Sequence, residues 1–155
     1  MSRWEGWTFN ILTIIVSASG AAYFWMKYLM KNDDPFSVVN HPWEPAMLKA
    51  HILAAPLLML ALGMMINSHI VKKLKTKNSR SHRVSGIICL VSFALMAASG
   101  YLLQVVVLPS RARALVVVHL AAGGLFVGAY LAHQAATLFL RESKGKQTGG
   151  SRLTA

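Results

Sequence analysis

The stretch ALVVVHLAAGGLFVGAYLAHQAATLFL, residues 114–140, decides the fold of this chain. It contains no Asp, Glu, Lys or Arg, and it is longer than the roughly 20 residues that a helix needs to cross a bilayer core. Two histidines, His119 and His133, interrupt the apolar sequence. A histidine inside a lipid-length apolar helix is costly to bury, and it therefore indicates a function.

Three further stretches are also free of charged residues, at 8–26, 52–71 and 84–110. They predict an all-α integral membrane protein, a four-helix bundle with helices at about 7–30, 46–71, 84–108 and 112–140. The apolar run of the first helix is too long for a signal peptide, so we expect the helix to be retained. Residues 1–141 then form one four-helix domain, and residues 142–155 form a disordered tail that is rich in Gly, Lys, Ser and Thr. No internal sequence repeat is evident.

The basic residues are concentrated at one side of the predicted membrane, although the whole chain carries a net charge of +11. Lys and Arg accumulate on the cytoplasmic side of membrane proteins. This rule places the 72–83 loop and both termini in the cytoplasm, and it indicates the bacterial inner membrane. It explains the charge better than binding of nucleic acid, even though Arg111 and Arg113 give a weaker opposing signal. The cytoplasmic residues are Lys72, Lys73, Lys75, Lys77, Arg80 and Arg83 in the loop, and Arg141, Lys144, Lys146 and Arg152 after the last helix.

Two of the predicted helices each carry a pair of histidines on one face. His51 and His69 are 18 residues apart, which returns to the same face about 27 Å further along a helix. His119 and His133 are 14 residues apart, about 21 Å along the axis and about 40° off the same face. Both helices run in the same direction across the membrane. We therefore expect an outer pair, His51 with His119, and an inner pair, His69 with His133, in which His82 is the alternative partner of His133.

Paired histidines from two helices are suited to hold haem iron through one imidazole on each side. The chain contains a single cysteine and no C-x-x-C-H motif, so the two predicted haems are of the non-covalent b type. Small residues give a flat macrocycle room beside the backbone, although they also serve helix packing. These are Gly63, Gly86, Gly100, Gly123, Gly124 and Gly128. Cations for the haem propionates, or simply for lipid headgroups, are Arg83 and Lys72 inside and Lys49, Arg111 and Arg113 outside.

Two other interpretations of the histidines stay open at this point. The first is a pathway for protons or metal ions, but the predicted spans contain no Asp or Glu, which such a pathway usually needs. The second is a structural role in a haem-free accessory subunit or small transporter. His41 lies in a loop beside two prolines, and we expect it at the surface.

Six segments carry a resemblance to a known family: HPWEPAMLKAH (41–51), GMMINSHIVKKL (63–74), SHRVSG (81–86) followed by SGYLLQ (99–104), and VVHLAAGG (117–124) with AYLAHQ (129–134). Over about residues 33–134 the chain resembles the bacterial four-helix dihaem cytochromes b. This group includes the membrane cytochrome subunits of formate dehydrogenases and Ni–Fe hydrogenases, and the likeness is greater to a branch of small dihaem-type membrane proteins. In the formate dehydrogenase type the first helix also supplies ligands, whereas the first helix here contains no histidine.

The resemblance implies a membrane cytochrome that carries electrons across the bilayer and works as a subunit beside other redox proteins. It also implies a link to quinone or quinol, although no motif in the chain identifies a quinone site. The chain has little mass outside the membrane and so no catalytic domain. We therefore expect an electron-transfer subunit rather than a complete enzyme.

Overall fold

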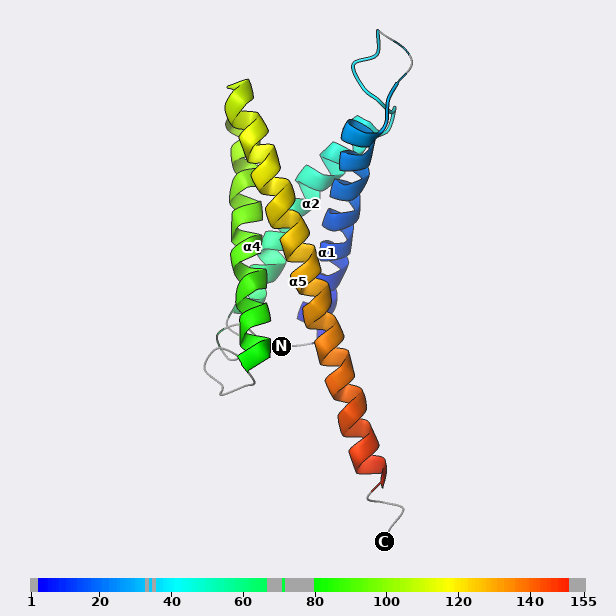
Figure 1. Ribbon diagram of the computed structural model, residues 1–155, viewed down its shortest axis with the longest axis vertical. Helices are drawn as coiled ribbons and strands as arrows, with labels where there is room; N and C mark the ends of the chain where they lie inside the picture. The colour runs from blue at the N-terminus through cyan, green and yellow to red at the C-terminus, as the bar shows by residue number, and fades with distance from the viewer. Residues whose placement is uncertain (1–2, 33, 35, 67–70, 72–79, 151–155) are drawn as a thin grey trace. The chain divides into compact units, whose positions relative to one another are not determined.

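The computed structural model describes residues 3–32, 34, 36–66, 71 and 80–150, with the backbone alone for residues 80–83 and 137–150. The elements are helix α1 (Arg3–Phe24), a π-helical segment η1 (Trp25–Leu29), α2 (Glu44–Met65), α4 (Arg80–Val105) and α5 (Pro109–Gly150) (Figure 1). Within the described residues the protein is all-α, as the uncharged stretches predicted.

Four helical spans are long and apolar enough to cross a membrane: Arg3–Leu29, Glu44–Met65, Val84–Val105 and Pro109–Ala136. Large apolar side chains point outward along all of them; Ile14 and Leu60 are each 64% exposed and Val117 is 66% exposed. Such exposure is unfavourable in water but suits contact with lipid tails. The fold therefore indicates a multi-pass membrane protein.

The ends of the helices differ from the predicted ends by a few residues. The first helix begins at Arg3 instead of residue 7, and α4 ends at Val105 instead of residue 108. Pro109 opens α5, because a proline lacks only an N–H that is unpaired in a first turn anyway.

The last helix continues to Gly150, whereas the sequence analysis predicted its end at 140 and a disordered tail over 142–155. The segment after Arg141 contains Glu, Lys and Gln, which are good helix formers, and no proline. Two glycines, Gly149 and Gly150, coincide with the end of the helix. Residues 151–155 lie outside the described part of the chain.

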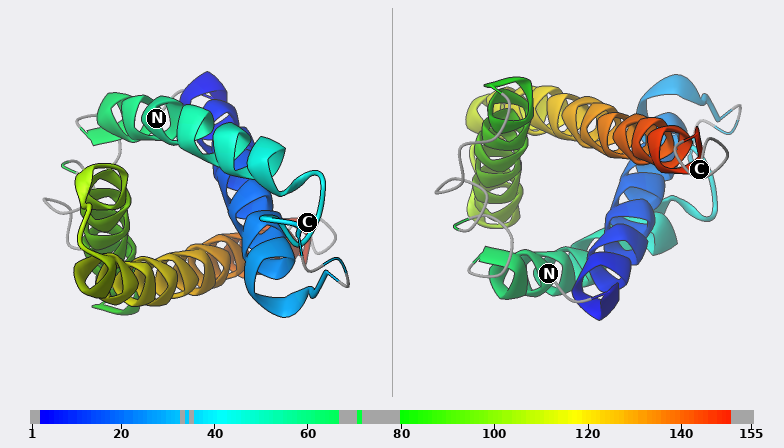
Figure 2. Two further views of the ribbon diagram at one scale, coloured as in Figure 1. Left: turned by 90° about the horizontal axis from the view of Figure 1, so that it is seen from above. Right: turned by 90° about the horizontal axis from the view of Figure 1, so that it is seen from below.

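The chain divides into two compact units, Met1–Lys77 and Asn78–Ala155, each built around one helical hairpin. In the first unit α1 packs against α2, and in the second α4 packs against α5. The two helices of each hairpin are tilted with respect to each other (Figure 2).

In the first unit the helices meet through small and medium-sized side chains. Leu58 and Ala61 of α2 are 2% and 1% exposed, and Val16 of α1 is 5% exposed. The hydroxyl of Thr13 is buried here, and it has no hydrogen-bond partner among the described residues. This hairpin therefore packs closely but leaves one polar atom unsatisfied.

In the second unit the core is aromatic. Phe93 of α4 and Phe126 of α5 are 5% and 3% exposed, and their rings meet edge to face with centroids 5.4 Å apart. The ring of Tyr130 stacks on that of Phe126, with centroids 6.0 Å apart. Edge-to-face and offset contacts of this kind are favourable in addition to the apolar area that they bury.

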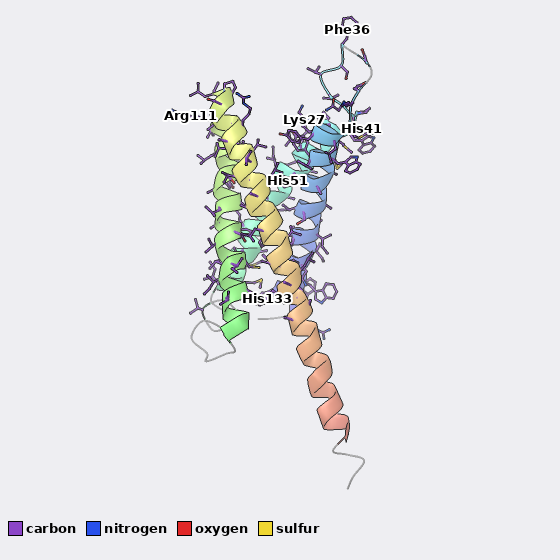
Figure 3. All side chains as sticks on the ribbon, in the orientation of Figure 1. Lys27, Phe36, His41, His51, Arg111 and His133 are labelled. Carbon is purple, nitrogen blue, oxygen red and sulfur yellow. The ribbon has the colours of Figure 1, made fainter. Side chains whose placement is uncertain are left out.

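An ion pair between Lys27 and Glu44, here called the latch, joins the two helical segments of the first unit at the end where the 30–43 loop connects them. The Lys27 ammonium contacts Glu44 Oε1 at 2.9 Å, and the Asn40 N–H donates to Glu44 Oε2 at 3.0 Å. The Asn40 side chain in turn donates to the Lys27 carbonyl at 2.9 Å. Lys27 and His41 lie at this end of the unit, and Phe36 lies at the far tip of the loop (Figure 3).

Candidate functional site

His51 of α2 lies against α1. Its Nδ1 atom is 2.9 Å from the carbonyl oxygen of Val16 and 3.5 Å from the hydroxyl of Ser19. The ring lies directly over Gly20, where an added Cβ would come within 2.8 Å of His51 Cε1. A side chain at residue 20 would therefore displace the imidazole, so glycine is required for this close approach.

His119 of α5 lies against α4 in the same way. Its Nδ1 atom is 2.9 Å from the carbonyl oxygen of Met96 and 3.3 Å from the hydroxyl of Ser99. An added Cβ on Gly100 would come within 3.0 Å of His119 Cε1. The ring is thus held by a carbonyl, a serine and a glycine, spaced along the neighbouring helix as Val16, Ser19 and Gly20 are in the first unit.

These contacts determine which ring nitrogen carries the proton. A carbonyl oxygen can only accept a hydrogen bond, so Nδ1 of His51 and of His119 must be the donor. In a neutral imidazole the lone pair then resides on Nε2. Histidines that bind metals almost always donate their other ring N–H to a carbonyl, carboxylate or water, and this bond orients the ring.

The third described histidine of the spans, His133, contacts a serine of its own hairpin. Its Nδ1 atom is 3.2 Å from the hydroxyl of Ser85 on α4. Here the adjacent glycine, Gly86, has open space where a Cβ would stand. His133 therefore shares the serine contact with the other two histidines but not the close approach to glycine.

The two hairpins are copies of one pattern, contrary to the expectation that the chain has no internal repeat. Adding 80 to the residue numbers of α1 gives α4, and adding 68 to those of α2 gives α5. Identical residues then coincide at the contact points, and the buried Leu58 coincides with the buried Phe126. The identical pairs are Arg3/Arg83, Gly6/Gly86, Ala18/Ala98, Ser19/Ser99, Gly20/Gly100, Ala46/Ala114, His51/His119, Ala54/Ala122, Leu57/Leu125 and Ala61/Ala129.

The repeat does not include the second histidine level. At the position of His133 the first unit has Met65, which is 8% exposed, and at the position of Ser85 it has Glu5. His69 follows Met65 by four residues in sequence and lies outside the described residues. This one-turn offset is the reason why the histidine spacing is 18 residues in one helix and 14 in the other.

The remaining predicted residues are placed only in part. His82 and Arg83 lie in the first turn of α4, close in sequence to Ser85, and their side chains are outside the described set. Arg111 is exposed in the first turn of α5, whereas His133 lies further along the same helix (Figure 3). The pairing of His51 with His119 and of His69 with His133, and the roles of Arg83 and Arg111 beside haem propionates, stay predictions.

Serines that contact histidines were missed in the sequence analysis, as was Gly20. A signal was present, because the chain contains the dipeptide Ser-Gly three times, at 19–20, 85–86 and 99–100. Each of these serines has its hydroxyl at the Nδ1 of one span histidine. Of the glycines predicted to give room, Gly100 lies under a ring, and Gly63, Gly124 and Gly128 have open space where a Cβ would stand.

Among the described residues, no group of three or more His, Cys, Asp or Glu could hold a metal ion. Structural zinc sites and carboxylate-bridged iron sites need at least three such ligands. Haem iron needs only one or two, because the macrocycle supplies the other four, and the orientation of His51 and His119 fits this requirement.

No protein-family model, curated protein or solved structure matches this chain. The resemblance to dihaem cytochromes b therefore stays an expectation from the sequence.

Proposed function

We propose that this protein is a membrane b-type cytochrome that carries electrons across the bilayer through two haems, each held between two histidines. The outer haem would be held by His51 and His119. The inner haem would be held by His133 with His69, or with His82 as the alternative ligand. The protein would act as a subunit beside other redox proteins, with quinone or quinol as a candidate electron donor or acceptor.

One observation carries the proposal: His51 and His119, which lie on two of the apolar spans, both donate from Nδ1 to a backbone carbonyl of the neighbouring helix. A buried histidine with a purely structural role needs hydrogen bonds but has no requirement for a particular tautomer. A haem ligand requires an unprotonated Nε2, and the contact of Nδ1 with a carbonyl oxygen favours this tautomer in both histidines. The same arrangement in two hairpins supports a common task for the two residues.

When bound, haem would supply a one-electron couple between ferric and ferrous iron. The chain's own contribution is to orient the imidazoles, to exclude water with apolar helices and to set the local polarity. The apolar spans would keep the site in a medium of low dielectric constant, where the charge of the iron would interact strongly with nearby groups. Arg83 and Arg111 are the cations proposed for the propionates.

The proposed orientation places both termini in the cytoplasm of a bacterium, with the chain in the inner membrane. Its support is the cluster of lysines and arginines between residues 72 and 83 and after residue 140. In this orientation the Lys27–Glu44 latch and the 30–43 loop lie on the outer side.

The test is a count of haem per chain by the pyridine haemochrome method on the detergent-purified protein, expressed with ample haem. We expect two b haems in the unchanged chain. His51→Ala, His119→Ala and His133→Ala should each reduce the count to about one. His41→Ala is the matched control, because His41 lies in the loop and its Nδ1 accepts the N–H of Trp43, so it should retain both haems.

One haem per chain would remove the route across the membrane. An absence of haem in every preparation would overturn the proposal, and it would favour the haem-free accessory subunit instead. Loss of haem in His41→Ala to the same extent as in His51→Ala would show that the assay reports general instability rather than ligation.

A further inference from the structure

Three polar residues in the spans have no role in the proposed function so far: Ser19, Ser92 and Ser99 are 8%, 1% and 3% exposed. Each hydroxyl donates to the carbonyl four residues earlier in its own helix, at 2.8 Å for Ser19 and 2.7 Å for the other two. Such back-bonding satisfies the hydroxyl donor of a buried serine and needs no second helix. Contact with a histidine is thus an additional property of Ser19 and Ser99.

The direction of the hydroxyl proton determines what the serine oxygen offers to the ring. Because the Ser19 and Ser99 protons point to backbone carbonyls, their oxygens present lone pairs. These oxygens are 3.5 Å from His51 Nδ1 and 3.3 Å from His119 Nδ1. Each Nδ1–H therefore faces two acceptors at once, a carbonyl at 2.9 Å and a serine oxygen.

A ring flipped by 180° would lose both acceptors, and a ring with its proton on Nε2 would point a lone pair at two oxygens. Both alternatives are unfavourable in a medium of low dielectric constant, where unpaired polar groups are costly. The glycine after each serine lets the ring come close enough for these contacts. The arrangement therefore selects one orientation and one tautomer before any ligand arrives.

We propose that Ser19 and Ser99 are positioning residues that lock His51 and His119 in the Nδ1–H tautomer, so that each hairpin presents Nε2 already oriented in the haem-free chain. The lock is a property of each hairpin by itself and occurs twice because the hairpin is repeated. Its use in holding haem rests on the proposed function; the tautomer itself does not.

The consequence for haem binding is preorganisation. A ligand that is already oriented loses less conformational freedom when it binds. Second-shell partners of metal-binding histidines typically change metal affinity by about 10–100-fold. Removing one of two acceptors should give an effect at the lower end, about 10-fold weaker haem binding for Ser19→Ala or Ser99→Ala.

The test is nitrogen NMR of the full-length, haem-free protein in detergent, labelled with ¹⁵N in histidine only. The two nitrogens of a neutral imidazole differ strongly in chemical shift, so the protonated one is identified directly. His51→Gln and His119→Gln assign the signals. We expect the Nδ1–H form at both residues, a changed His51 signal alone in Ser19→Ala, and a changed His119 signal alone in Ser99→Ala.

Ser92→Ala is the matched control, because Ser92 has the same burial and back-bond but no contact with His51 or His119. It should leave both histidine signals unchanged. Ser19→Thr, which retains a hydroxyl, should restore the His51 signal. An Nε2–H form at either histidine in the unchanged chain, or Ser19→Ala and Ser99→Ala spectra identical to that of Ser92→Ala, would overturn the lock.

Haem titration of the same variants separates this inference from the proposed function. If the chain binds haem, Ser19→Ala and Ser99→Ala should bind it about 10-fold more weakly, whereas Ser92→Ala should bind it normally. If no variant and no unchanged chain binds haem while the NMR shows the Nδ1–H form, the lock stands and the cytochrome proposal fails.

Discussion

Replacing Gly20 by alanine should displace His51 without adding polarity or charge. The new Cβ would stand 2.8 Å from His51 Cε1 and 2.9 Å from Nδ1, whereas ordinary contact begins at 3.4 Å. The ring must therefore move by about 0.6 Å or more. A shift of this size along the contact would lengthen the bond of Nδ1 to the Val16 carbonyl from 2.9 Å to about 3.5 Å, beyond the usual range.

The expected cost comes from two sources. Overpacking in a close contact typically costs about 1–3 kcal/mol, and loss of one hydrogen bond costs about 0.5–1.5 kcal/mol. Alanine also favours the helix by about 1 kcal/mol relative to glycine. We therefore expect Gly20→Ala to destabilise the first hairpin by about 1–3 kcal/mol and to release one of two haems.

The chain offers a graded series of controls for this change. Gly100→Ala meets the His119 ring at 3.0 Å and should have a smaller effect, Gly123→Ala makes an ordinary contact at 3.7 Å, and Gly124→Ala meets nothing within 4 Å. The assays are thermal unfolding in detergent and haem content per chain. If Gly20→Ala and Gly124→Ala gave the same melting temperature and the same haem content, the close approach of the ring to Gly20 would be refuted.

Three further predictions concern the hairpins themselves. Phe126→Ala removes a side chain that is 3% exposed and contacts Phe93. It should lower the free energy of unfolding of the second unit by about 3–5 kcal/mol, as measured by thermal melting. A loss below about 1 kcal/mol would contradict the aromatic core. Thr13→Val replaces a buried hydroxyl without a partner among the described residues by a methyl group of similar size. It should stabilise the first unit by about 1 kcal/mol, and destabilisation would show that the hydroxyl is bonded. Glu44→Gln removes the charge that pairs with Lys27, whose side chain is 38% exposed. It should lower the free energy of unfolding by only about 1 kcal/mol. It should also speed proteolysis within the 30–43 loop, and an unchanged rate of cleavage would refute the latch.

The sequence alone predicted the number of helices and their approximate positions. An uncharged run such as 114–140 has few structures available to it other than a helix, because backbone polar groups must be paired inside a lipid layer. Helix ends were predicted less well, because they depend on individual residues. Pro109 opened a helix earlier than expected, and α5 continued beyond 140, through Gly145, because the segment contains good helix formers and no proline.

The sequence also identified His51, His119 and His133 as the polar residues that require an explanation, because a histidine in an apolar span is costly wherever the helix packs. It did not identify their partners. Ser19 and Gly20 are 32 and 31 residues away from His51 in the chain, and small residues at such distances are common in any membrane helix. The repeat was hidden for the same reason, because few identical residues mark it and the connecting loops differ in length.

The composition and the spacing of charges thus determined that this chain forms four lipid-length helices with histidines in two of them, since burial of polar groups in lipid leaves little freedom. Only the tertiary structure decided which helix His51, His119 and His133 contact, and that Nδ1 is the donor in His51 and His119. Those properties depend on contact distances between helices, and a change of a few tenths of an ångström in such a distance matters. Examples are the contacts of the His51 ring with Gly20 and with the carbonyl of Val16. Hydrophobic periodicity within one helix does not specify which residues of a partner helix it will contact, so such contacts are determined by packing.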